Sequence, residues 1–137
     1  MLRRVLLVED SDDDVELTRV ALRNTGTRIE LDVARDGEEA LQTLMSRRPR
    51  PDLILLDLNM PRMDGREFLA RLKGHPEWGT VPVIVLTTSS SPDDIEACYA
   101  GGANCYVTKP VDFNDFRQAL TTLFAFWFGI ARLPRPT

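Results

Sequence analysis

Three acidic residues in this sequence follow short apolar runs and could together carry phosphoryl chemistry. Glu9 and Asp10 follow one such run, and Asp57 follows another. If the runs are neighbouring parallel strands, the carboxylates that end them meet at one edge of a sheet. Carboxylates this close repel one another, and a hard cation such as Mg²⁺ removes the conflict. We expect Asp10 and Asp57 to bind Mg²⁺ directly, Glu9 to bind it through water, and the Asn59 backbone carbonyl to add an oxygen.

Two further residues at expected strand ends have side chains suited to a transferred phosphoryl group. Lys109 is one of only two lysines in a chain with 17 basic residues, and its ammonium is a mobile point charge for phosphoryl oxygens. Thr87 offers a short hydroxyl to such an oxygen. A carboxylate such as Asp57 can attack phosphorus and form an acyl phosphate. This reaction needs mainly positioning and charge neutralisation, which these residues would supply.

Each of these residues also has a purely structural interpretation. Glu9, Asp10 and Asp57 could be acids that meet water at the end of a strand. Thr87 could be a structural hydroxyl, and Lys109 could belong to a surface turn. What indicates a site is that all of them fall at the carboxyl ends of expected strands.

The rest of the sequence predicts the elements that position these residues, because short apolar runs alternate with amphipathic stretches that begin at capping residues. The expected strands are residues 4–8, 30–34, 53–56, 81–86 and 104–107. The expected helices are residues 12–24, a helix after Asp36, residues 66–73, a helix from Pro92 to a stop at Gly101, and a helix from Asp112 to as far as Phe128. Residues 47–51 are expected to form a loop, and the aspartates at 12–14 to favour a helix N-terminus. The alternation predicts an α/β fold, a doubly wound parallel sheet with helices on both faces.

Composition limits the class of protein. A chain of 137 residues, 43% hydrophobic and 28% charged, suits one globular domain spanning residues 1–137. No apolar run approaches the roughly 20 residues that span a bilayer, and the N-terminus lacks a secretory signal. We therefore expect a cytoplasmic protein that does not bind a membrane. The net charge of −4 argues against nucleic-acid binding. Cys98 and Cys105 are expected to be small buried residues, without a disulfide or zinc site.

Four segments resemble the receiver domains of two-component response regulators, which are related to the chemotaxis response regulator. They are Val-Glu-Asp at 8–10, Asp-Leu-Asn-Met-Pro-Arg-Met-Asp-Gly at 57–65, Leu-Thr-Thr at 86–88 and Tyr-Val-Thr-Lys-Pro at 106–110. The resemblance covers about residues 4–125. It implies a flavodoxin-like fold, with five parallel strands in the order 2-1-3-4-5 and five helices.

The resemblance also implies roles for individual residues. Asp57 would be the phosphoacceptor, charged from a phosphohistidine on a sensor histidine kinase, with Mg²⁺ held at the acidic cluster. Thr87 and Tyr106 would be a switch pair, in which the hydroxyl moves toward the phosphoryl group and the ring turns inward. The peptide bond between Lys109 and Pro110 would be cis. Asn59 and Ser89 match positions that tune the lifetime of the acyl phosphate. The protein would catalyse only its own phosphorylation and dephosphorylation.

The C-terminal part of the sequence is unusually aromatic, with six of the ten aromatic residues from Phe113 onward. A helix on one face of a sheet needs a single apolar stripe, which can be filled by Phe113, Phe116, Leu120, Leu123 and Trp127. Phe126, Phe128 and Ile130 are then surplus, within an apolar C-terminal extension at residues 124–137. We expect these three to form a homodimer patch on the face made by the fourth helix, fifth strand and fifth helix. The alternative is that the tail folds back over its own core.

Two features narrow the kind of response regulator. Only 27 residues follow Pro110 and the last helix takes most of them, so we expect no fused output domain. The Glu-Asp-Ser-Asp-Asp-Asp start and the Phe- and Trp-rich tail that ends in Leu-Pro resemble the small regulators paired with bacterial phytochrome kinases. This resemblance implies light as the input, sensed by the kinase.

Other functional classes place different demands on these residues. A phosphatase of the haloacid dehalogenase type would need an acid–base Asp two residues after its nucleophile, where Asn59 stands. A degenerate receiver would have lost an active-site residue, and none is missing. A phosphorelay shuttle would have the same site residues, so the sequence does not separate it from a terminal receiver.

Overall fold

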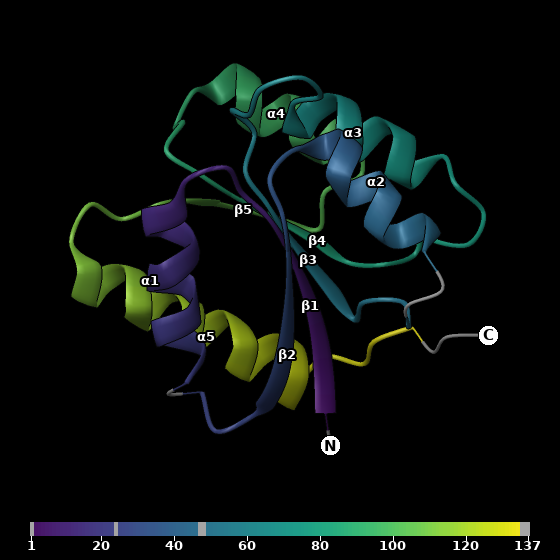
Figure 1. Cartoon of the computed structure of the whole chain (residues 1–137). Coiled ribbons are helices and arrows are strands. Elements are labelled where there is room, and N and C mark those ends of the chain that lie inside the picture. Colours follow the sequence, from purple (N-terminus) through teal and green to yellow (C-terminus); the bar gives the residue numbers. More distant parts are fainter. Residues whose placement is uncertain (1, 24, 47–48, 135–137) are drawn as a thin grey trace.

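Five parallel strands form one sheet at the centre of the molecule (Figure 1). The structure is a computed structural model that describes residues 2–23, 25–46 and 49–134. The strands are β1 (Leu2–Val8), β2 (Arg28–Ala34), β3 (Leu53–Leu56), β4 (Val83–Thr87) and β5 (Cys105–Thr108). Their order, β2-β1-β3-β4-β5, confirms the predicted doubly wound, flavodoxin-like topology. The order reverses between β1 and β3, and such a switch point is where ligands bind in open α/β sheets.

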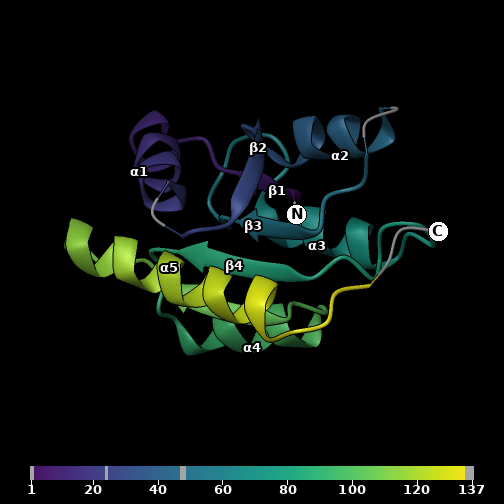
Figure 2. The ribbon, with the colours of Figure 1, turned by 90° about the horizontal axis from the view of Figure 1, so that it is seen from below.

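Five helices cover the two faces of the sheet. They are α1 (Asp12–Leu22), α2 (Gly37–Met45), α3 (Gly65–Lys73), α4 (Pro92–Ala100) and α5 (Phe113–Gly129). α1 and α5 lie on one face, and α2, α3 and α4 lie on the other (Figures 1 and 2). Each helix begins after a side chain that accepts a hydrogen bond from a backbone N–H of the first turn, the usual N-cap. The five capping residues are Ser11, Asp36, Asp64, Ser91 and Asp112.

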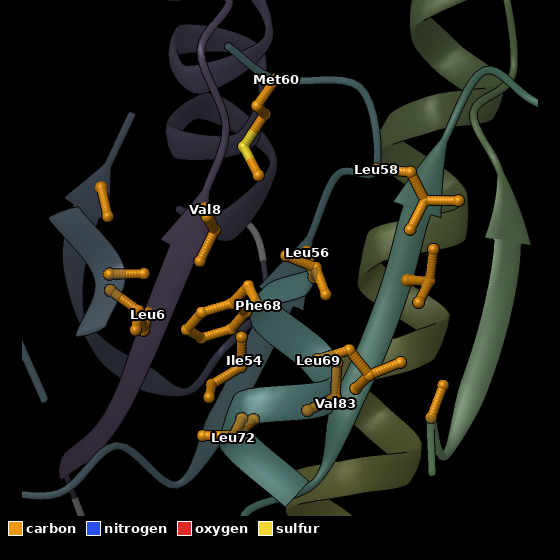
Figure 3. Close-up of a cluster of buried hydrophobic side chains, with 14 of the residues drawn as sticks. Leu6, Val8, Ile54, Leu56, Leu58, Met60, Phe68, Leu69, Leu72 and Val83 are labelled. Carbon is orange, nitrogen blue, oxygen red and sulfur yellow. The ribbon is translucent and has the colours of Figure 1, made fainter. Parts of the chain in front are cut away.

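The strands feed two hydrophobic cores because successive side chains point to opposite faces. In β3, Leu53 and Leu55 pack under α1 and α5, whereas Ile54 and Leu56 pack under the other three helices. On that second face, Phe68 of α3 points toward Leu6 and Val8 of β1 (Figure 3). Since both faces are covered, β3 and β4 are apolar in all but the last residue of β4, which is Thr87.

Element boundaries differ from the predicted ones by a few residues. β4 begins at Val83 because Pro82 has no N–H to donate, although its carbonyl accepts from Ile54 at 3.0 Å. β2 begins earlier than predicted, at Arg28, because β1 supplies pairing partners from Leu2 onward. Asn24, the predicted end of the first helix, lies outside the described residues, as do positions 47–48 of the predicted loop.

The apolar stripe of α5 keeps four of its five predicted residues, since Phe116 and Leu120 are buried and Leu123 and Trp127 pack half-buried against the core. The buried residues are Phe116, Leu120 and Phe124, at a spacing of four. Phe128 continues this row, is half-buried, and stacks on Phe124 with ring centroids 5.5 Å apart. The guanidinium of Arg3 lies over the Phe128 ring, 5.6 Å from its centroid. Phe128 therefore belongs mainly to the protein's own core, which corrects its predicted place in a surplus patch.

Other aromatic and apolar side chains of this region remain exposed. Phe113 is 38% exposed, which corrects its predicted place in the stripe. Phe126 and Ile130 are 48% and 75% exposed, as expected of surplus residues. The predicted extension from residue 124 begins inside α5, and its residues 135–137 lie outside the described part of the chain. None of the helices in the described ranges is long and apolar enough to cross a membrane.

Candidate functional site

The carboxyl ends of β1, β3 and β4 bring the predicted acidic and hydroxyl residues to one place. Glu9 and Asp10 follow β1, Asp57 follows β3, and Thr87 is the last residue of β4. Backbone hydrogen bonds fix these ends, because the Asp57 N–H donates to the Val8 carbonyl at 3.0 Å. The strand pairing that the apolar runs encode therefore sets the spacing of the carboxylates.

Glu9, Asp10 and Asp57 form an acidic cluster that fits a divalent cation. One carboxylate oxygen from each lies within 4.8 Å of the others, and among the described residues no second group of this kind occurs. Glu9 and Asp57 are buried, and Asp10 is exposed. Burial, with a smaller contribution from the nearby Asp57, raises the pKa of Glu9 to about 7 against the lowering effect of Lys109. Clustered hard oxygen atoms with this mutual repulsion are a donor set for Mg²⁺ or a similar ion.

Lys109 lies over the cluster as a nearly buried cation. Its ammonium donates to Glu9 Oε1 at 2.5 Å and to Asp14 Oδ2 at 2.7 Å. Burial alone would lower the pKa of Lys109, but the hydrogen bonds to the two carboxylates outweigh it and raise the pKa. The predicted residue is thus at the site, and it contacts Asp14, which sequence reasoning assigned only to the start of a helix.

Thr87 carries a hydroxyl that is ready for a partner. Its side chain is fully buried, and Oγ1 is the one buried side-chain polar atom without a hydrogen bond in the described part of the chain. An unpaired buried hydroxyl costs about 1–3 kcal/mol, so such a group calls for an explanation. A phosphoryl oxygen arriving at the acidic cluster would supply the missing partner.

Replacing Thr87 with Val should leave the metal-free protein as stable as wild type, or up to about 1 kcal/mol more stable, because no hydrogen bond is lost. Urea unfolding measures this. Thr18→Val is the matched control, since the equally buried Thr18 hydroxyl donates to the Asp14 carbonyl at 2.8 Å and its loss should cost about 1 kcal/mol. A loss at Thr87 as large as the control's would contradict this description.

Tyr106 is turned inward beside the end of β4. Its hydroxyl donates to the Ser89 carbonyl at 2.8 Å, and its ring packs on the core beneath α3 and α4. Ser89 in turn donates from Oγ to Asp94 at 2.6 Å, and Arg66 of α3 bonds the same carboxylate at 2.8 Å. The hydrogen bond from Ser89, together with Arg66, lowers the pKa of Asp94. The loop after Thr87 is therefore tied to both β5 and α3.

One predicted local feature is wrong. The peptide bond between Lys109 and Pro110 is trans, like all others in the described segments. Proline makes the cis form accessible without requiring it, so the residue type alone did not decide the isomer.

Comparison with known proteins identifies a family that has this kind of site. The family model described as "Response regulator receiver domain" matches residues 5–121. The chain belongs to this family. Receiver domains are phosphorylated on an aspartate by partner histidine kinases, bind a divalent metal at the acidic pocket, and act as signal switches and not as metabolic enzymes.

Relatives of this receiver domain include regulators from phytochrome signalling. Response regulator Rcp1 of Synechocystis sp. is 42% identical over 135 residues, which are 95% of this chain and 92% of Rcp1. The phosphorylated cyanobacterial phytochrome response regulator RcpA superposes with a TM-score of 0.94 at 39% identity, over 98% of this chain and all of RcpA. The Mn²⁺-bound form of Rcp1 superposes with a TM-score of 0.90 at 40% identity, over 97% and 99% of the two chains. This receiver domain resembles Rcp1 and RcpA along nearly its whole length.

Proposed function

We propose that Asp57 accepts a phosphoryl group from a phosphohistidine of a sensor histidine kinase in a Mg²⁺-dependent step. The observation that carries this proposal is the convergence of the acidic cluster, the Lys109 ammonium and the unpaired Thr87 hydroxyl at one edge of the sheet. Each part has a role in phosphoryl transfer, and each comes from a different strand end.

The transfer step forms one bond and breaks one. Oδ1 of Asp57 accepts the Leu58 N–H at 2.9 Å, so the attack on phosphorus falls to Oδ2. A P–O bond forms as the P–N bond to the histidine breaks, and the imidazole leaves with the bonding electrons and takes a proton. Lys109 neutralises developing charge on the phosphoryl oxygens, and Thr87 donates its hydroxyl to one of them.

Mg²⁺ would be held by Asp10, Asp57 and the Asn59 carbonyl, with Glu9 in contact through water, and when bound it supplies charge neutralisation for the incoming group. To bind the phosphoryl group, the Lys109 ammonium gives up its hydrogen bonds to Glu9 and Asp14 and donates to the phosphoryl oxygens instead. The signal would then pass through Thr87 and Tyr106, since the Tyr106 ring already lies against the loop that a moving Thr87 would displace.

The partner kinase is, on this proposal, a bacterial phytochrome. The support is the name of RcpA, a phytochrome response regulator that matches this chain in fold and along its length. The phosphoryl group would be transferred in the cytoplasm, where an ATP-using kinase operates. A shuttle that passes the group on to a histidine domain would use the same residues, so the proposal covers both a terminal receiver and a shuttle.

We also propose a homodimer through the face made by α4, β5 and α5. A shallow groove of about 460 Å³ lies between Val107 of β5 and the side chains of α5. Thr122 lines this groove, and Phe126 follows it by four residues on the same side of the helix. Exposed Phe126 and Ile130 thus extend the groove with apolar surface, while Phe128 turns toward the core. Adjacent exposed apolar side chains of this kind favour a protein partner.

Changing Ile130 to Lys should weaken the dimer at least about tenfold, because a charge would enter its apolar centre. Sedimentation velocity across a concentration series measures the dissociation constant. Met45→Lys is the matched control, because Met45 is an equally exposed apolar residue on α2, away from this face. A wild-type protein that stays monomeric, or equal effects of the two variants, would contradict the dimer proposal.

The phosphoacceptor proposal is tested by intact mass after incubation with acetyl phosphate and Mg²⁺. Wild type should gain one phosphoryl mass, and the gain should vanish on chelation of the metal. Asp57→Asn should gain none, whereas Asp52→Asn, in the same segment but ahead of β3, should behave as wild type. Phosphorylation of Asp57→Asn to the wild-type level would overturn the proposal.

A further inference from the structure

The loop between β3 and α3 is fastened to the turn between β2 and α2. Arg62 of the loop donates from Nε to Asp36 Oδ2 at 2.7 Å, and its Nη2 bonds the same oxygen. Next to this ion pair, the Gly37 N–H donates to the Met63 carbonyl at 2.9 Å. One side-chain contact at Arg62 and one backbone contact at Met63 therefore hold the loop against the turn.

Asp36 is a fully buried acceptor that is built into the fold. Its Oδ1 accepts the Glu39 N–H at 2.9 Å as the N-cap of α2, which leaves Oδ2 for Arg62. Burial acts to raise the pKa of Asp36, but the Glu39 N–H and the Arg62 guanidinium lower it more, so the net shift is downward. The carboxylate is thus ionised at neutral pH and gives Arg62 a fixed, charged partner.

The backbone conformation of Arg62 indicates that contacts hold the loop in this position. Its φ is 59°, and it is the one non-glycine residue with positive φ among those described. This conformation is sterically unfavourable for a residue with a Cβ and persists only where the surroundings impose it. The Arg62 side chain is 64% exposed, so burial does not impose it, whereas the ion pair with Asp36 can.

The turn side of the contact is equally restricted. A Cβ at Gly37 would lie 2.9 Å from the backbone carbonyl oxygen of Met63, so the close approach of loop and turn requires glycine. At the other end of the loop, the Gly65 N–H donates to the Leu58 carbonyl at 3.0 Å, and a Cβ at Gly65 would lie 2.8 Å from the Leu58 Cα. The loop is pinned at both points, and Asn59 lies between them.

We infer that Arg62 is a positioning residue: its ion pair with Asp36 fixes the loop that presents the Asn59 carbonyl beside Asp57, and so sets the affinity of the acidic cluster for a divalent cation. The inference rests on the metal site of the proposed function and adds a residue that touches neither metal nor phosphoryl group. Groups that orient metal ligands typically change affinity by about 10- to 100-fold when removed. Because a backbone carbonyl is only one ligand of several, the lower figure is expected here.

Mg²⁺ and Mn²⁺ binding to the full chain, measured by calorimetry without any phosphoryl donor, tests this inference. Arg62→Ala and Arg62→Gly should each weaken binding about tenfold. Glycine removes the backbone strain, so a loss in both variants assigns the effect to the side chain. Arg62→Lys should recover part of the affinity, since it restores charge without the planar fork. Arg71→Ala, an exposed arginine on α3, should bind as wild type.

A second measurement separates positioning from general destabilisation. Amide hydrogen exchange in the metal-free protein should be faster for residues 59–64 in Arg62→Ala, with exchange in β3 and β4 unchanged. Wild-type affinity and wild-type exchange in Arg62→Ala would overturn the inference while leaving the phosphoacceptor proposal intact. Absence of metal binding by wild type would instead overturn the metal site of the proposed function, and this inference with it.

Discussion

Replacing Lys109 with Met, which removes the charge and shortens the side chain by one atom, should slow phosphorylation by acetyl phosphate about 100- to 1,000-fold. The ammonium is the only basic group that bonds the acidic cluster in the described segments, and loss of one preorganised group that stabilises transition-state charge has an effect of this size. The rate of phosphoryl gain, followed by intact mass at saturating Mg²⁺, measures it.

The chain offers a matched control in its other lysine. Lys73 is also partly buried, and its ammonium donates to the carbonyls of Gly79 and Val81 and to Asn104, at the amino ends of β4 and β5. Lys73→Met should lower stability without changing the phosphorylation rate of the folded protein. Equal slowing by the two variants would show that Lys109 acts through stability and not at the reaction centre.

The metal-free protein should lose stability as the pH rises from about 4.5 to about 7. Burial raises the pKa of Glu9 from 4.5 to about 7, so the folded protein holds a proton there that the unfolded chain releases. Its contribution is therefore complete below pH 4.5 and is lost as the pH rises through the folded pKa. At about 1.4 kcal/mol per pKa unit, the loss is roughly 3 kcal/mol. Urea unfolding at a series of pH values in the presence of chelator measures it.

Two comparisons isolate Glu9 in this experiment. Glu9→Gln cannot ionise and should give a flat profile over the same range. The carboxyls of Asp36 and Asp94 have lowered pKa values, so their contributions change only at more acidic pH. Mg²⁺ binds the deprotonated cluster and should restore stability increasingly as the pH rises. Identical profiles for wild type and Glu9→Gln would contradict the assignment.

The fold was predictable because its signals are local and agree with one another. Each helix starts at a capping side chain, and β3 and β4 are apolar on both faces, which only a sheet covered on both sides explains. The strand ends then follow from the same runs, and with them the places of Glu9, Asp10, Asp57 and Thr87. The site could be predicted because the helix caps, the strand patterning and the residue types at the strand ends all indicate the same fold.

What the sequence did not reveal depends on contacts between distant segments. Asp14 looks like any acid in a first helical turn, and only the fold brings Lys109 to it across 95 positions. The pairing of Arg62 with Asp36 likewise has no periodic signal, because both residues lie in irregular turns. On α5, several apolar stripes fit the helical period, so the choice between Phe113 and Phe128 for the core was decided by packing.

The most direct test of the account is to locate the phosphoryl group after reaction with acetyl phosphate and Mg²⁺. Borohydride reduces an aspartyl phosphate to homoserine, and tandem mass spectrometry of the proteolysed chain then identifies the reduced residue. We predict homoserine at position 57 alone, dependent on the metal and absent when the donor is omitted. Homoserine at another aspartate, or none in protein that binds the metal, would contradict the assignment of Asp57 as the phosphoacceptor.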